Sequence, residues 1–134
     1  MRPRYADLFR RLRDPDPIKQ DAAYDAVLFD REEALPDVVE CYGLSHDDAL
    51  MRYFMVQLMA FSGSKGAVKP LIRALEDPDP LVRVEACRGL EDLRSKTAMP
   101  ALRARLTDLD ADVREAASDA LEAIRGAAAV VKIR

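Results

Sequence analysis

Apolar residues recur every three or four positions along most of the chain, and they fall into paired stripes. One stripe consists of Val68, Leu71, Ile72 and Leu75, and the next consists of Val82, Ala86, Leu90 and Leu93. This spacing places each set on one face of an α-helix. Outside the short apolar segment 130–133, no stretch alternates with the two-residue period of a strand. The pattern therefore predicts an all-α chain.

The tetrapeptide Asp77-Pro78-Asp79-Pro80 separates these two stripes. Pro78 is expected to end the first helix, because the residue before a proline avoids the α-helical region. Asp79 is then a suitable N-cap, and Pro80 fits the first helical position, where a missing N–H costs nothing. The tetrapeptide therefore predicts a sharp corner between two antiparallel helices.

This helical hairpin is repeated along the chain. Residues 68–93 align with residues 99–124 at an offset of 31. In this alignment the apolar positions of the two segments coincide, and so do the predicted turns. The same tetrapeptide also occurs at 14–17, an offset of 63 from the other copy. Stacked hairpins bury stripes that one hairpin alone leaves exposed, so the repetition predicts an α-solenoid. We expect one domain over residues 1–134, with repeats at about 4–30, 33–61, 66–94 and 97–125 and a C-terminal tail at 126–134.

The last two repeats resemble HEAT repeats, most closely the short bacterial and archaeal kind named after the phycobilisome lyases. The residues that carry the resemblance are Leu71, Leu75, Asp77, Val82, Arg83 and Ala86, with Asp108, Asp110, Val113, Arg114, Ala117 and Leu121. The resemblance implies about four hairpins in a right-handed superhelix. It also implies that an arginine near the start of the second helix pairs with the turn aspartate, as Arg83 with Asp77 and Arg114 with Asp108. In the earlier repeats, His46 replaces the aspartate and Gln20 replaces the arginine.

Composition narrows the function classes. The formal net charge of −3 does not favour general attraction to nucleic acid or to an anionic membrane. We expect no signal peptide and no membrane-spanning segment, because no apolar run is long enough. Two cysteines cannot build a disulfide framework, so a reducing, cytoplasmic setting is expected.

The sequence offers little chemistry for catalysis. The chain has a single histidine, His46, and two separated cysteines, which cannot supply a usual zinc site. The glycines at 63 and 66 lack the spacing of a phosphate-binding loop. We therefore predict a protein that is not an enzyme, with no metal and no cofactor.

HEAT-like solenoids bind other proteins through the second helices of their repeats, so the resemblance implies a partner on that side. Residues 50–61 are apolar on nearly every face of the predicted helix, which indicates either a thick core or a hydrophobic groove. All eight aromatic residues lie between Tyr5 and Phe61. The residues predicted to bind the partner are Phe29, Tyr53, Phe54, Gln57, Phe61, Glu85, Arg88 and Glu122.

The sequence and the resemblance together predict a non-catalytic protein–protein interaction module. One alternative is an accessory subunit of a lyase or another enzyme complex, of the tetrapyrrole type. Another is nucleic-acid binding through the arginine-rich residues 2–13, which the overall charge makes the less favoured choice. The tail at 126–134 is apolar, so we expect it to fold back over the last repeat or to mediate self-association.

Overall fold

The computed structural model describes the backbone of residues 1–133 and the side chains of residues 1–126. Within these residues every regular element is helical. Four hairpins follow one another: α1 (Pro3–Arg11) with α2 (Pro17–Phe29), α3 (Arg31–Leu44) with α4 (Ala49–Phe61), α5 (Val68–Ala74) with α6 (Pro80–Asp92), and α7 (Met99–Ala104) with α8 (Ala111–Ile133). Short 3-10 helices precede α5 and α7 and follow α7, as η1 (Lys65–Ala67), η2 (Lys96–Ala98) and η3 (Arg105–Thr107).

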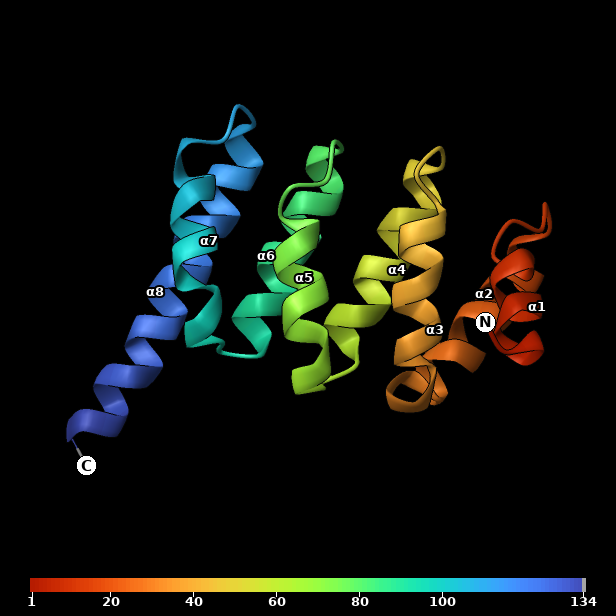
Figure 1. Cartoon of the computed structure of the whole chain (residues 1–134), viewed down its shortest axis with the longest axis horizontal. Helices are drawn as coiled ribbons and strands as arrows, with labels where there is room; N and C mark the ends of the chain where they lie inside the picture. The colour runs from red at the N-terminus through yellow and green to blue at the C-terminus, as the bar shows by residue number, and fades with distance from the viewer. Residues whose placement is uncertain (134) are drawn as a thin grey trace.

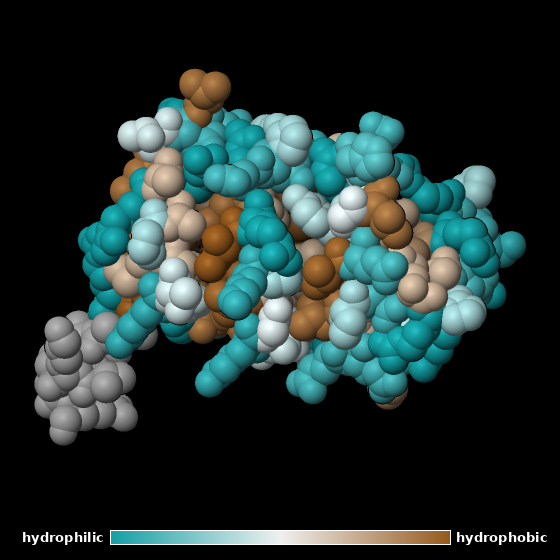
Figure 2. All heavy atoms as spheres, in the orientation of Figure 1, coloured by the Kyte–Doolittle hydropathy of each residue, from teal (hydrophilic) through white to brown (hydrophobic). Residues whose placement is uncertain are grey.

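The hairpins stand side by side in chain order and form an all-α solenoid (Figure 1). The first helices α3, α5 and α7 make one layer, and the second helices α4, α6 and α8 make the layer behind it. Helix α6 packs against both α4 and α8. Figure 2 shows that the face with α3, α5 and α7 is mostly hydrophilic, with hydrophobic residues visible mainly between neighbouring helices. That face has the character of a solvated surface.

The corners between helices form as the sequence predicted. The Asp79 carboxylate accepts a hydrogen bond from the Leu81 amide at 2.9 Å and so caps α6. Asp77 accepts one from the Asp79 amide at 2.9 Å, which tightens the turn before the cap. Asp110 caps α8 in the same way without a proline, since its carboxylate accepts from the amide of Asp112 at 2.9 Å. Aspartate side chains thus satisfy the free N–H groups at the helix starts.

One continuous hydrophobic core runs from Tyr5 in α1 to Ile124 in α8. Helix α4 is buried on several faces, and its buried apolar residues are Met51, Met55, Val56, Leu58, Met59 and Ala60. The apolar character of residues 50–61 therefore reflects a thick core rather than a continuous exposed apolar groove. Gly89 of α6 faces this helix closely, because a Cβ built on Gly89 would lie 2.9 Å from the Cβ of Ala60.

The second helices of the middle hairpins end in equivalent left-handed residues. Gly63 after α4 has φ of 66°, and Arg94 after α6 has φ of 50°. A left-handed conformation costs little for glycine but about 1–2 kcal/mol for most other residues. We expect Arg94→Gly to raise the free energy of unfolding by up to ~1 kcal/mol, measured by urea unfolding. The matched change Gly63→Arg should lower it, and equal small effects of both would contradict the strain at these positions.

Helix α8 extends to Ile133, so the tail of the fourth repeat continues the same helix. The prediction that residues 126–134 fold back or self-associate concerns side-chain packing in 127–134. These side chains lie outside the described residues.

Candidate functional site

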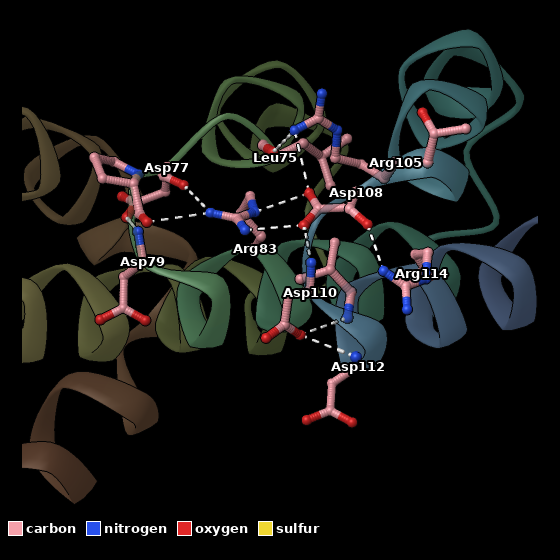
Figure 3. Close-up of polar contacts among 12 residues, drawn as sticks. Leu75, Asp77, Asp79, Arg83, Arg105, Asp108, Asp110, Asp112 and Arg114 are labelled. Atoms are coloured by element: carbon pink, nitrogen blue, oxygen red, sulfur yellow. Dashed lines mark hydrogen bonds and ion pairs between the residues drawn. The ribbon is translucent and has the colours of Figure 1, made fainter.

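Charged side chains join consecutive hairpins along one edge of the second-helix layer. The guanidinium of Arg52 bonds to the carboxylate of Asp77, with Nε 3.0 Å from Oδ2. The guanidinium of Arg83 bonds to both carboxylate oxygens of Asp108, at 3.0 and 2.9 Å. Each arginine also donates to carbonyls of the turn in its own hairpin, and Figure 3 shows Arg83 held between the two turns. We call these two pairs the arginine–aspartate ladder.

The ladder corrects the pairing that the resemblance implied. Arg83 contacts Asp77 only through its carbonyl, at 2.8 Å, while its charge is paired with the aspartate of the next hairpin. Arg114 likewise donates to the carbonyl of Asp108, at 2.7 Å. The pairs within one repeat are therefore backbone contacts, because the stacking of hairpins brings each guanidinium within reach of the following turn. His46 fits this arrangement, since Arg52 needs only its carbonyl, at 2.8 Å.

The ladder aspartates Asp77 and Asp108 are buried, and the carboxylate of each accepts several hydrogen bonds. Asp77 also accepts a hydrogen bond from the Tyr42 hydroxyl, at 2.6 Å. Burial and this bond to Asp77 raise the pKa of Tyr42. Burial alone would raise the pKa of Asp108, but the hydrogen bonds from Arg83 and from the Asp110 amide outweigh burial and lower it. The ladder thus has a structural role, because each of its buried carboxylates is paired with a guanidinium of the preceding hairpin.

The N-terminal arginines are engaged by carboxylates of the same chain. Arg2 bonds to Asp37 at 2.6 Å, Arg4 pairs with Asp30, and Arg13 pairs with Asp48. Arg10 and Arg11 both pair with Asp7, at 3.1 and 2.9 Å. A surface for nucleic acid needs cations that are free to meet phosphates. The arrangement therefore weakens the nucleic-acid alternative for residues 2–13.

A groove of about 460 Å³ lies across helices α4, α6 and α8. Its apolar and basic lining residues are Tyr53, Leu81, Val84, Arg88 and Ala116, and its acidic lining residues are Glu85, Glu91, Asp112, Glu115 and Asp119. Successive lining positions on α6 and α8 are one or three residues apart and so recur every three or four residues, as one face of a helix requires. The groove is therefore built from the facing surfaces of consecutive second helices.

Glu85 is the only one of the five lining carboxylates that is buried. Its carboxylate pairs with Arg88 at 3.1 Å, and its side chain is almost fully enclosed while that of Arg88 is exposed. Burial, followed by the nearby Glu85 charge, raises the pKa of both Tyr24 and Tyr53. The groove thus has a buried carboxylate at its floor, paired with an exposed guanidinium.

The structure brings only part of the predicted binding set into this groove. Tyr53, Glu85 and Arg88 line it. Phe54 instead packs half-buried against the core, edge-on to Tyr24 at 6.1 Å, and Gln57 accepts a hydrogen bond from the Tyr24 hydroxyl at 2.7 Å.

The other three predicted residues are exposed outside the groove. Phe29 is 87% exposed and Phe61 is 49% exposed, each at the last position of its helix. Glu122 is exposed on α8 beyond the lining residues. Whether any of these residues contacts a partner stays a prediction.

Sequence reasoning missed Glu91, Asp112, Leu81, Val84 and Ala116 as lining residues. The register of the second helices could have found them, because they continue the spacing of Glu85, Arg88, Glu115 and Asp119. Glu91 lines the groove, whereas its neighbour Asp92 does not. Moving along a helix by one residue rotates the side-chain direction by about 100° around the helix axis. A single sequence does not define this rotation relative to the neighbouring helices.

The described residues provide little reactive chemistry. Burial raises the pKa of the Cys41 thiol and raises that of Cys87 to about 12, so both thiols are protonated and poorly nucleophilic. His46 is exposed in a turn, with Nε2 3.4 Å from Asp47. Within residues 1–126, no three His, Cys, Asp or Glu side chains are grouped so as to hold a metal ion. The expected absence of a metal or cofactor remains a prediction.

Comparison with known families and structures agrees with the fold. The family model for HEAT repeats matches residues 36–122, which is more than half of the chain. The chain therefore belongs to the HEAT-repeat family, and HEAT repeats generally mediate protein–protein interaction. The finer resemblance to the phycobilisome-lyase kind stays a prediction. A comparison with curated protein sequences finds no match.

One solved structure is informative about the extent of the similarity. The structure of human deoxyhypusine hydroxylase in complex with glycerol is similar over 91% of this chain, with 25% sequence identity and a TM-score of 0.68. The chain spans only 43% of the hydroxylase chain. In the part of the chain that the structure describes, no helix is long and apolar enough to cross a membrane.

Proposed function

We propose that this chain is a non-catalytic protein-binding module whose partner occupies the groove across α4, α6 and α8. The observation that carries the proposal is the groove itself, which combines exposed apolar surface with charged side chains on three consecutive second helices. A binding site of this kind needs an apolar centre with a polar border. Tyr53 and Arg88 belong to the residue types that contribute most to such sites. The protonated, buried cysteines support a role without covalent catalysis.

Site-specific photo-crosslinking in the source cell tests this proposal. A photoreactive p-benzoylphenylalanine replaces Leu81, which lines the groove and is 62% exposed. The matched control carries the same group in place of Leu44, which is 66% exposed at the end of α3 in the other layer. We expect a discrete adduct with another protein from position 81 and little or none from position 44. Equal adducts from both positions, or none from position 81, would contradict the groove as the binding site.

A role inside an enzyme complex is a second candidate. It is favoured by the similarity to human deoxyhypusine hydroxylase, of which this chain spans 43%. Under this candidate the groove would receive another subunit of the enzyme. The adduct from position 81 distinguishes the two, because its identification by mass spectrometry reveals whether the captured polypeptide is an enzyme subunit.

A further inference from the structure

The lining of the groove is strongly acidic. Five carboxylates and one guanidinium line it, a formal charge of −4, whereas the whole chain carries −3. Among the described side chains, Glu85 is the only one of these five carboxylates with an ion-pair partner, Arg88. The arginines of α1, by contrast, are paired with carboxylates of the chain itself. The groove lining therefore carries a negative charge that the described side chains of this chain do not balance.

The carboxylates on α8 repel one another. Asp112, Glu115 and Asp119 are spaced by three and four residues, so they share one helix face. Like charges at this spacing destabilise a helix. Asp112 is compensated by its place in the first turn, where the helix dipole favours an acid. Glu115 and Asp119 lie beyond that turn and have no ion-pair partner among the described side chains, so a cation brought from outside would relieve their repulsion.

Apolar surface lies beside these charges. Leu81 is largely exposed at the start of α6, and the Tyr53 ring is half-buried against the core. Val84 and Ala116 continue the apolar surface between α6 and α8. A small inorganic cation would leave this surface in water. A ligand that satisfies both features must carry apolar side chains together with several positive charges.

We propose that the partner presents a cationic amphipathic segment, with lysine or arginine side chains opposite Glu91, Glu115 and Asp119 and apolar side chains against Tyr53 and Leu81. This inference rests on the proposed function and adds the chemistry of the partner. Charge complementarity of this kind sets specificity and speeds association, and it weakens as salt screens the charges.

Two synthetic peptides of about 18 residues with helical hydrophobic periodicity, one of leucine and lysine and one of leucine and glutamate, probe the groove. Fluorescence anisotropy with the full chain should show binding of the lysine peptide at least ~10-fold tighter than of the glutamate peptide, and weaker at high salt. In the triple variant Glu91→Gln/Glu115→Gln/Asp119→Asn, we expect the affinity for the lysine peptide to fall ~10-fold or more. Its melting temperature should not fall, because the repulsion on α8 is relieved.

A matched variant separates the groove from net charge alone. The change Glu32→Gln/Asp47→Asn/Glu76→Gln removes the same charge from exposed positions outside the groove lining. It should leave the affinity for the lysine peptide within about twofold of that of the parent chain. Equal losses in the two triple variants, or equal binding of the two peptides, would overturn the inference.

The crosslinking experiment keeps this inference distinct from the proposed function. If position 81 captures a protein, mass spectrometry maps the crosslinked stretch, which we expect to be rich in lysine and arginine. A captured stretch that is neutral or acidic, or that belongs to a second copy of this chain, would overturn the cationic segment while leaving the groove as a binding site. Absence of any adduct at position 81 would overturn both.

Discussion

Replacing Arg52 with methionine should lower the free energy of unfolding by about 3–5 kcal/mol. The substitution leaves the Asp77 carboxylate without its guanidinium in a site where that side chain is fully buried. The Tyr42 hydroxyl and the Asp79 amide still donate to it, but neither carries a charge. The carbonyls of Ser45 and His46 lose their donor as well. A buried charge without its counter-ion is among the most costly single defects in a protein.

Urea unfolding followed by circular dichroism measures this loss. The matched control is Arg11→Met, which breaks the exposed pair with Asp7. Exposed pairs contribute about 0–1 kcal/mol, so this variant should remain close to the parent chain. Similar losses for the two variants, or a loss below about 1 kcal/mol for Arg52→Met, would show that the ladder does not carry the stability assigned to it.

Replacing Gly89 with alanine should also destabilise the fold, by about 1–3 kcal/mol. The added Cβ would lie 2.9 Å from the Ala60 Cβ, 3.0 Å from Leu71 Cδ1 and 3.2 Å from the Ala60 Cα. The last contact involves backbone, so a side-chain rotation cannot relieve it. Helix α6 would have to move away from α4, and the core packing on both sides would loosen.

Gly43 provides the control for this prediction. It lies in helix α3, and a Cβ built there meets nothing within 4 Å. Gly43→Ala should therefore stabilise the chain, by about 0.5–1 kcal/mol, because alanine loses less backbone freedom on folding. Thermal melting of both variants gives the comparison. A destabilised Gly43→Ala, or an unchanged Gly89→Ala, would contradict the close approach of α4 and α6.

The sequence was sufficient to predict the helical hairpins and the turns between their helices. Helical spacing and the Asp-Pro-Asp-Pro corner are local, so they can be deduced from neighbouring residues. The partner of Arg83 could not be deduced in this way, because Asp108 belongs to the next hairpin and is reached only through stacking. Two features depend on the rotation of each helix about its axis, which tertiary packing sets. One is the partial burial of Phe54, and the other is that Glu91 rather than Asp92 faces the groove.

The arginine–aspartate ladder begins at the second hairpin, so the contacts between consecutive hairpins differ along the solenoid. From α4 to α8, buried ion pairs fasten one hairpin to the next, and burial shields them from salt. The first hairpin has Gln20 in place of a ladder arginine and is fastened through Arg2 and Arg13, whose side chains are about half exposed. Among the ion pairs between hairpins, those between the first and second hairpins are therefore the most sensitive to ionic strength. Salt should weaken the ion pairs of α1 with the second hairpin more than the buried pairs of the ladder, so the contribution of charge to hairpin stacking varies along the chain.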